Sequence, residues 1–422
     1  MKILVIGGGG REHAVAKALA KNVAVEKIWV APGNGGTASF CENLNIAATD
    51  LKGVLDFCLE KRPDFVVVTP DDPLALGMVD LLEDNDIPCF GPRKAAARLE
   101  WSKSYAKEFM GKYNIPTAKC HVCEDAKAAK AYVKKCQIPI VLKADGLAQG
   151  KGVVVALTRE EAVAAQAQLS YGRNDQVMVF EEMLTGPEVS ILCFTDGKTI
   201  VPMPAAQDHK RAYDGDKGPN TGGMGAYSPV SAYTEELSER CMREIFLPTI
   251  RGMEQEGTPF KGVLYFSLML TEKGPKVIEY NARFGDPETQ VVLPLLNADL
   301  LNIMIAVRSE KLDKAKIKFL DNYSACVVMA SGGYPSAYEK GKLICGIEEA
   351  GHFGTVYHAG TKKTFDGSFV TSGGRVLCVS SLGRSLRQAL RNCYRGVETI
   401  RFEGAYYRRD IGSKDAAIVR EE

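Results

Sequence analysis

Short apolar segments that read as strands alternate with helical segments through the first hundred of the 422 residues of this chain. Strands are predicted at Lys2–Ile6, Lys27–Ala31 and Phe65–Thr69, where apolar and β-branched residues predominate. Such alternation is typical of a parallel sheet with helices on both faces, whose ligands bind at the carboxyl ends of its strands. We therefore expect a doubly wound α/β domain at residues 1–101.

The rest of the chain is too long to share that core, because single hydrophobic cores stop growing at roughly 250–300 residues. Single helices are expected at about Lys94–Tyr113, Pro294–Glu310 and Ser385–Ile400. The last of these follows short strands with glycine turns, which indicate a small α+β domain. The predicted domains after the first are a central one at 102–322, with a hairpin-bearing lobe at about 118–190, and a C-terminal one at 323–422.

Composition limits the classes of protein. Lysine and arginine total 53 against 52 acids, so nothing favours a nucleic-acid partner, and the hydrophobic fraction of 45% is that of a globular protein. No apolar run approaches the ~18 residues that span a bilayer, and the N-terminus reads as a strand rather than a signal peptide. The 12 cysteines are scattered, and Cys120–Cys123 lacks the second pair of a zinc site. We expect a cytoplasmic location without a membrane partner.

Val277–Gln290 carries the most specific chemistry, in the order V-I-E-Y-N-A-R-F-G-D-P-E-T-Q. Residues two apart on a strand share a face, so Glu279 and Asn281 project together. A carboxylate and an amide oxygen are ligands that Mg²⁺ accepts when nucleotide phosphates and water complete its shell. Arg283, on the same face, brings a planar cation suited to a carboxylate or phosphate. The alternative is an edge strand with a solvated polar face.

A second motif, K-A-D-G-L-A-Q-G-K-G, runs from Lys143 to Gly152 between two predicted strands. It is not a P-loop, since its spacing differs, the Ser/Thr ligand of Mg²⁺ is missing, and a strand follows in place of a helix. A hairpin that closes over a triphosphate through backbone N–H groups fits better, with Lys143 reaching the phosphates. The alternative is a mobile surface hairpin with a solvated lysine.

The first predicted strand ends in four glycines, Gly7–Gly10, followed by Arg11, Glu12 and His13. Glycines before a helix let backbone N–H groups approach an anion. The motif is not a dinucleotide fingerprint, because Glu12 takes the place of the third glycine and no acid ends the second strand. A sugar phosphate fits better than NAD, and the alternative is an ordinary tight turn.

The order of a glycine-rich hairpin, two separated lysines and a strand with E-x-N-x-R resembles that of the ATP-grasp superfamily. Over essentially its whole length the chain is similar to the phosphoribosylamine–glycine ligase family within it. The resemblance rests on motifs at Gly7–His13, Ala31–Thr37, Lys143–Gly152, Gln207–Arg211, Gly218–Pro229, Glu279–Gln290, His358–Lys362 and Gly373–Val379. Together these motifs are highly specific.

The resemblance implies synthesis of glycinamide ribonucleotide from glycine and phosphoribosylamine in purine biosynthesis, with ATP split to ADP and phosphate. ATP would phosphorylate glycine to glycyl phosphate, which the amine of phosphoribosylamine would attack. The implied fold is a two-lobed ATP-grasp domain between the N-terminal and C-terminal domains. The implied cofactors are ATP and Mg²⁺ or Mn²⁺, and the expected partners are the two substrates, bound by a monomer or weak homodimer.

The resemblance also implies roles for individual residues. The implied metal ligands are Glu279 and Asn281, and the implied catalytic residues are Arg283, Lys143 and Asp208. Nucleotide binding falls to Lys103, Lys143, Gly146, Gly150, Lys151, Gly152, Glu181, Glu182, Met183, Leu184 and Glu188. Substrate binding falls to Gly9, Gly10 and Arg11 for the phosphate of phosphoribosylamine, Asp208 for the ammonium of glycine, and Arg283 for the acyl phosphate.

Two positions depart from the pattern. Many ATP-grasp enzymes have a further metal-binding acid near the place of Ser267, and Asp71-Asp72 stands where the family more often has a glutamate and a small residue. Three alternatives therefore stay open: a different ATP-grasp enzyme, a nicotinamide-dependent oxidoreductase, and a binding protein without catalysis. A turnover that needs no glycine would favour the first of these.

Overall fold

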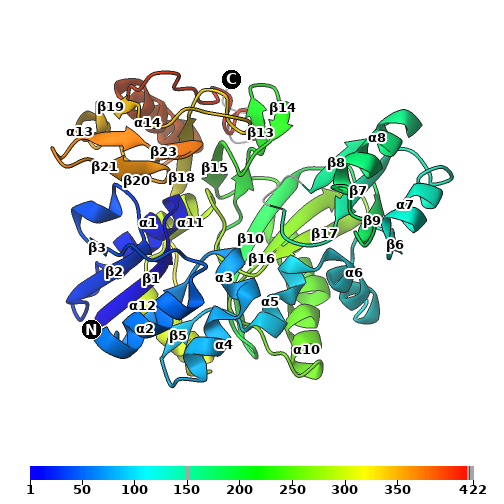
Figure 1. Cartoon of the computed structure of the whole chain (residues 1–422), viewed down its shortest axis with the longest axis horizontal. Coiled ribbons are helices and arrows are strands. Elements are labelled where there is room, and N and C mark those ends of the chain that lie inside the picture. Colours follow the sequence, from blue (N-terminus) through cyan, green and yellow to red (C-terminus); the bar gives the residue numbers. More distant parts are fainter. Residues whose placement is uncertain (149–151, 416–417, 419–422) are drawn as a thin grey trace.

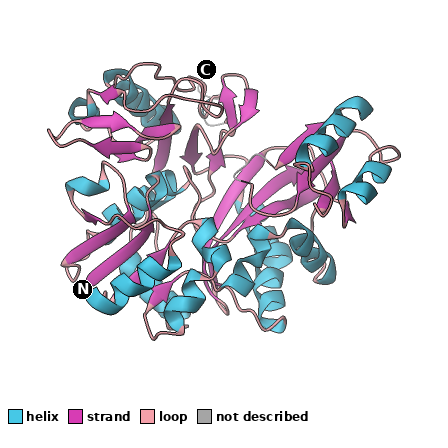
Figure 2. Ribbon diagram, in the orientation of Figure 1, coloured by secondary structure: helices cyan, strands magenta, loops and turns pink. Residues whose placement is uncertain are grey.

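The computed structural model describes residues 1–148, 152–415 and 418, and Figure 2 shows its mixture of helices and strands. The N-terminal elements are β1 (Lys2–Gly7), α1 (Gly10–Leu19), β2 (Lys27–Pro32), η1 (Thr37–Ser39), β3 (Glu42–Asn43), α2 (Leu51–Lys61), β4 (Phe65–Val68), α3 (Asp71–Leu76), α4 (Met78–Glu83), β5 (Cys89–Phe90), α5 (Lys94–Trp101) and α6 (Lys103–Lys112). The central elements are β6 (Cys120–Cys123), α7 (Ala126–Tyr132), β7 (Ile140–Ala144), β8 (Val153–Ala156), α8 (Arg159–Leu169), β9 (Met178–Glu182), β10 (Glu188–Asp196), β11 (Ile200–Pro202), β12 (Gln207–Asp208), β13 (Arg211–Tyr213), β14 (Lys217–Asn220), β15 (Gly225–Ser228), α9 (Glu235–Cys241), η2 (Met242–Phe246), α10 (Leu247–Gln255), β16 (Lys261–Thr271), β17 (Gly274–Asn281), α11 (Thr289–Leu295), α12 (Leu300–Arg308) and η3 (Leu312–Lys314). The C-terminal elements are β18 (Tyr323–Ala330), β19 (Leu343–Ile344), α13 (Ile347–Ala350), β20 (Thr355–His358), β21 (Thr361–Lys363), β22 (Phe369–Thr371), β23 (Arg375–Gly383) and α14 (Leu386–Thr399).

The N-terminal sheet is parallel, in the order β3-β2-β1-β4-β5, and lies at the lower left of Figure 1. Ile3 and Val5 of β1 belong to the same buried cluster as α1 and α12, whereas Leu4 and Ile6 belong to the cluster that includes α2. Alternate side chains of one strand thus feed two cores on opposite faces of the sheet. The predicted doubly wound α/β fold is confirmed.

The centre of the molecule consists of two antiparallel sheets, the two lobes expected of an ATP-grasp fold. The sheet β6-β9-β7-β8 carries α7 and α8 and projects to the right in Figure 1. The sheet β11-β10-β16-β17 lies beside it, nearer the middle of the view. The end of β17 therefore lies where the two lobes and the N-terminal elements meet, which is the place of the candidate site.

A fourth sheet, β12-β15-β18-β23-β20, is antiparallel and packs against α14. Its strands β12 and β15 come from the long polar stretch between residues 207 and 228, and Gly225 of β15 pairs with Val327 of β18. This sheet joins segments from both sides of the boundary at residue 323. The expected small α+β C-terminal unit is present, and the exact domain boundaries stay a prediction.

Two segments that were each predicted to be one helix form two helices in the structure. Residues 94–112 form α5 and α6, separated at Ser102, whose extended backbone caps α6 through a bond that its hydroxyl accepts from the Tyr105 N–H. The region near Pro294 likewise divides into α11 and α12, and the Asp299 side chain caps the second helix. These two predictions were wrong because capping side chains inside a helical pattern were overlooked, whereas the helix expected near Ser385–Ile400 is confirmed as α14. In the described part of the chain, no helix is both long and apolar enough to cross a bilayer.

Candidate active site

The β16–β17 hairpin sets the direction of the side chains at the centre of the site. Glu279 lies directly opposite Ser267, and a bulge follows between Ser267 and Leu268. Tyr280 is 2% exposed and faces the core, so the half-buried Glu279 and Asn281 on either side of it share the other face. The two side chains therefore project from the same face of β17, as the sequence predicted. Ser267 stands where many ATP-grasp enzymes have a further metal-binding acid. Its hydroxyl donates a hydrogen bond to Glu188 Oε1 at 3.0 Å.

Glu279 stands in a positive environment. Burial raises the pKa of its carboxyl, but nearby cations outweigh burial and hold the pKa below its ordinary value. These cations are Lys210, Lys143, Lys103 and Arg283. Four residues from different parts of the chain therefore converge on one carboxylate, as a site for a highly charged anion requires.

Lys143, one of the two lysines predicted to bind phosphates, is fixed by a hydrogen bond and an ion pair. Lys143 Nζ is 2.9 Å from Glu181 Oε1 and donates to the Ile278 carbonyl at 3.0 Å. Lys107 Nζ lies 2.9 Å from the other Glu181 oxygen, and all three side chains are 4% exposed or less. Two cations on one acid leave a net positive charge at this buried site. Lys107 was missed by the sequence analysis, because a lysine in a helix ordinarily reads as a solvated residue.

Lys103, the first residue of α6, donates to the Gly146 carbonyl at 2.7 Å. It thereby joins α6 to the start of the glycine-rich hairpin. Gly152 lies at the other end, where its carbonyl accepts the Ala144 N–H at 2.9 Å. Gly150 and Lys151, both predicted to bind nucleotide, lie outside the described residues.

The predicted adenine-binding residues lie at and beyond the end of β9. The ladder between β7 and β9 ends with Ile140 opposite Glu182, so Met183 and Leu184 continue beyond the sheet with backbone groups that need other partners. The Glu182 side chain is directed to Lys276, at 2.7 Å. Glu188, predicted to hold the ribose, forms an ion pair with Lys210.

Asp208 occupies the edge strand β12, next to the loop at Gly223. Its Oδ1 is buried and has no hydrogen-bond partner among the described residues. Burial and the nearby Glu288 raise the pKa of Asp208 well above its ordinary value, against Lys210 and Arg375. Buried carboxylate oxygens normally have partners, so this oxygen is suited to a cationic group of a ligand.

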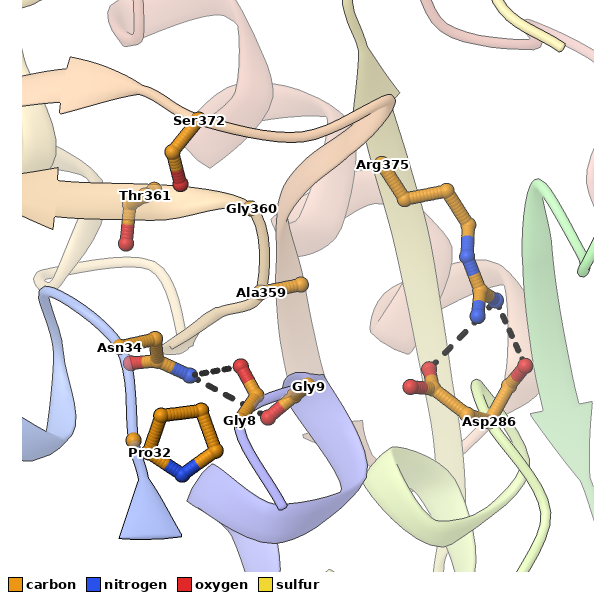
Figure 3. A pocket seen from close by; sticks show the side chains of 11 residues that line it. Gly8, Gly9, Pro32, Asn34, Asp286, Ala359, Gly360, Thr361, Ser372 and Arg375 are labelled. Atoms are coloured by element: carbon orange, nitrogen blue, oxygen red, sulfur yellow. Dashed lines mark hydrogen bonds and ion pairs between the residues drawn. The ribbon is translucent and has the colours of Figure 1, made fainter. Parts of the chain in front are cut away.

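A cavity of about 350 Å³ lies between the N-terminal sheet and the C-terminal elements, and Figure 3 shows its lining. The lining residues are Gly8, Gly9, Pro32, Gly33, Asn34, Asp286, Ala359, Gly360, Thr361, Ser372 and Arg375. Asn34 ties the two walls together, because its amide donates to the Gly8 carbonyl at 3.0 Å and to the His358 carbonyl at 2.8 Å. On the opposite side Arg375 lies 3.5 Å from Asp286 Oδ1 and donates to the Asp286 carbonyl at 2.6 Å.

Carboxylates of the protein already accept hydrogen bonds from backbone N–H groups at the start of α1. Gly9 N–H donates to Glu12 Oε2 at 2.6 Å, and Arg11 N–H lies 3.4 Å from Asp286 Oδ2. The Arg11 guanidinium pairs with Glu12 and donates to the Phe284 carbonyl at 3.0 Å. Of the three residues predicted to hold the sugar phosphate, the structure places Gly9 along the cavity but not Gly10 or Arg11. A further anion at this helix end would face two carboxylates.

The residues present fit a divalent cation whose shell is completed by a ligand. No group of three or more His, Cys, Asp or Glu side chains in the described ranges converges as a metal site. Glu279 and Asn281 supply two hard oxygens, which is the number that Mg²⁺ takes when phosphates and water provide the rest. The cysteines are free throughout the described chain, and neither Cys120 nor Cys123 belongs to a metal cluster.

Three family models match the chain in order. They describe the phosphoribosylglycinamide synthetase N domain at residues 1–100, its ATP-grasp (A) domain at 101–289 and its C domain at 324–414. The chain is 46% identical over 430 aligned residues to a phosphoribosylamine–glycine ligase of Vibrio vulnificus, with all of both chains covered. It is 47% identical to the trifunctional purine biosynthetic protein adenosine-3 of Gallus gallus, over 99% of this chain and 42% of that one.

Solved structures agree with this similarity. The crystal structure of phosphoribosylamine–glycine ligase from Thermotoga maritima matches 98% of this chain and 100% of its own, with a TM-score of 0.85 and 35% identity. A biotin carboxylase domain of 2-oxoglutarate carboxylase from Hydrogenobacter thermophilus, solved with MgADP, ADP and bicarbonate, shares the fold at 17% identity and a TM-score of 0.72, over 96% and 91% of the two chains. The motifs, the geometry of the site and these full-length similarities together place the chain in the phosphoribosylglycinamide synthetase family.

Proposed function

We propose that this ligase joins glycine to phosphoribosylamine at the end of β17, with ATP on one side of that strand and phosphoribosylamine in the cavity on the other. The products are glycinamide ribonucleotide, ADP and phosphate. The observation that carries the proposal is the set of charged side chains held at the end of β17, where Lys143 Nζ donates to the Ile278 carbonyl at 3.0 Å and Arg283 Nη2 lies 3.0 Å from Glu100 Oε1. Lys103, Lys143, Lys210 and Arg283 together hold the pKa of Glu279 below its ordinary value. The turn that follows this strand contributes Asp286 to the cavity wall, so the two substrate regions are joined by one short segment.

The nucleotide would lie between the two central sheets. Backbone groups at Glu182, Met183 and Leu184 would meet the adenine edge, because the β9 ladder ends there. Glu188 would accept hydrogen bonds from the ribose. Lys103 and Lys143 would neutralise phosphate oxygens, and the hairpin that begins at Gly146 would close over them through its backbone N–H groups.

Glu279 and Asn281 would hold Mg²⁺ or Mn²⁺, which supplies charge neutralisation to the phosphates when bound. The protein's own contribution is positioning, since phosphoryl transfer needs little covalent help. Asp208 would bind the ammonium of glycine through its unpartnered Oδ1, so that the glycine carboxylate faces the terminal phosphate. Arg283 would then stabilise the charge that develops on the acyl phosphate. Closure of the hairpin excludes water that would hydrolyse this intermediate.

Charge decides the orientation of phosphoribosylamine in the cavity. Asp286 and Arg375 lie at one end, whereas the Thr361 and Ser372 hydroxyls and Asn34 lie at the other, as Figure 3 shows. The Asp286 carboxylate and the Arg375 guanidinium already engage each other, so the phosphate would bind at the hydroxyl end, where Thr361, Ser372 and Asn34 can donate hydrogen bonds. The amine would then face Asp286, three residues from Arg283, which is where the acyl phosphate forms.

The test is Mg²⁺-dependent ADP release with glycine and freshly generated phosphoribosylamine, with each substrate omitted in turn. We expect release only when both are present, together with one glycinamide ribonucleotide per ADP. Release with another carboxylate or amine in their place would retain the ATP-grasp mechanism and reject these substrates. The same assay with Mn²⁺ tests the metal preference. Oligomeric state and cytoplasmic location stay predictions.

A further inference from the structure

Helix α5 brings one buried acid, Glu100, to the end of β17. Its side chain is 8% exposed. Its two oxygens contact two successive residues of the strand end: Oε2 accepts the Ala282 N–H at 2.7 Å, and Oε1 lies 3.0 Å from Arg283 Nη2. One carboxylate therefore binds both the main chain and the guanidinium at the point where the strand leaves its sheet.

The Ala282 N–H needs such a partner. The ladder between β16 and β17 ends with Tyr265 opposite Asn281, so the next N–H has no strand to donate to. Ala282 is 1% exposed, and a buried N–H without an acceptor is costly. Glu100 supplies the acceptor and so fixes the chain immediately after Asn281.

The guanidinium of Arg283 is only partly satisfied by the protein. One Nη lies against Glu100, and the other donates to the Phe284 carbonyl at 3.3 Å. Its Nε is buried and has no hydrogen-bond partner among the described residues. A donor held in one orientation and left free is suited to an anion that forms during the reaction. Rotation of the guanidinium would misdirect this donor.

Charge favours the same arrangement. Burial raises the pKa of Glu100 to about 7, although Arg283 opposes this shift. The Glu100 carboxylate, with Oε1 3.0 Å from Arg283 Nη2, places an opposite charge directly against this guanidinium. Glu100 also lies three residues before Lys103, so the same short segment of chain reaches both sides of the nucleotide region.

We propose that Glu100 is a positioning residue, which holds the Arg283 guanidinium and the turn after β17 in the orientation that meets the acyl phosphate. This inference rests on the proposed function, because it assumes that Arg283 acts there. A structural role for Glu100 alone would affect stability, whereas a positioning role affects turnover without weakening substrate binding.

The test is Glu100→Gln, whose amide oxygen can still accept the Ala282 N–H but whose charge toward Arg283 is lost. We expect kcat to fall about 10- to 100-fold, as for small displacements of a catalytic group, with the KM for ATP and for glycine within about 3-fold. Glu108→Gln, at an exposed position of the adjoining helix α6, is the matched control and should leave both constants unchanged. A normal kcat with a lowered melting temperature would overturn the positioning role.

Arg283→Lys, alone and combined with Glu100→Gln, separates this inference from the proposed function. We expect the double variant to be no slower than Arg283→Lys, since both changes affect one group. Losses that multiply would overturn the inference and leave the function of Arg283 intact. A fully active Arg283→Lys would reject the role of Arg283 itself and the inference with it. If Glu100→Gln does not fold, Glu100→Asp keeps the charge with a shorter reach, and a normal kcat in that variant would overturn the inference.

Discussion

The region proposed for the nucleotide and the cavity proposed for phosphoribosylamine differ in how their charged side chains are arranged. Around the nucleotide region, buried side chains of opposite charge lie within 3 Å of one another, as in Lys107, Glu181 and Lys143. The cavity is lined largely by glycine backbone, an amide and two hydroxyls, with a single ion pair between Asp286 and Arg375 at one end. The first region uses ionised groups fixed in advance, and the second uses close backbone approach. If the proposed sites are right, one enzyme binds two phosphates by unrelated means.

Two histidines outside the cavity lining are uncharged, although the lining itself includes the charged pair Asp286 and Arg375. His13 of α1 and His358 of β20 meet at the junction of the N-terminal and C-terminal elements, where the His358 N–H donates to His13 Nδ1 at 2.9 Å. Burial lowers the pKa of His13 to about 3 and that of His358 to about 4. Both imidazoles are therefore neutral at physiological pH. The junction depends on neutral contacts, whereas the nucleotide region depends on balanced ions.

The largest expected effect is in the nucleotide region. Glu279→Gln should lower kcat by at least about 100-fold, because the variant loses the carboxylate that would hold the metal and balance the surrounding cations. The measurement is ADP release at saturating substrates, beside a melting curve. Glu272→Gln, at the exposed turn of the same hairpin, is the control and should behave as wild type. Near-normal turnover of a well-folded Glu279→Gln would reject the metal assignment.

A smaller and more selective effect is expected in the cavity. A Cβ at Gly8 would lie 2.6 Å from the Gly33 carbonyl oxygen, so Gly8→Ala must displace one wall of the pocket. We expect the KM for phosphoribosylamine to rise about 10-fold and that for ATP to change by less than about 2-fold. Gly111→Ala provides the comparison, since a Cβ there meets nothing within 4 Å. Equal changes in both KM values would mean that the two regions are not independent.

The smallest effect concerns stability and pH. The unfolded chain protonates His13 and His358 below about pH 6.5, whereas the folded chain does so only near pH 3 and 4. The unfolded state thus binds more protons in that window, and stability falls as the pH is lowered. We expect a loss on the order of 1–2 kcal/mol per imidazole between pH 7 and 5.

Denaturant titrations at pH 5, 6 and 7 measure this slope. His13→Asn retains an acceptor for the His358 N–H and should show a shallower dependence on pH. His121→Asn, at an exposed position, should keep the slope of the wild type. An unchanged slope in His13→Asn would show that this junction does not exclude the charged imidazole.

Much of the nucleotide region could be predicted from the sequence, because it follows local periodicity. Alternation along one strand predicted that Glu279 and Asn281 face the same way, and the glycine-rich hairpin could be separated from a P-loop by its spacing. The functions of these residues stay proposals, but Lys103 and Lys143 are among the cations that lower the pKa of Glu279. Glu100 and Lys107 were missed, because an acid or a lysine in a helix gives no sign that it is buried.

The cavity could not be predicted in the same way. Arg11 was expected to hold a phosphate, yet Glu12 and the Phe284 carbonyl occupy its guanidinium. Thr361, Ser372 and Arg375 were not identified individually, since they come from the C-terminal elements and carry ordinary side chains. The contact between Asn34 and His358 joins residues that are 324 positions apart, and no local pattern reports such a pairing.

By itself the sequence determined the class of the main strands and helices, the family of the chain and the chemistry that its charged motifs can perform. These depend on periodicity, glycine placement and residue type, all of which are properties of short segments. Only the tertiary structure decided which charges meet, which hydrogen-bond donors stay free, and where the second substrate fits. Those features depend on desolvation and on contacts between distant segments, whose free energies exist only once the sheets have packed.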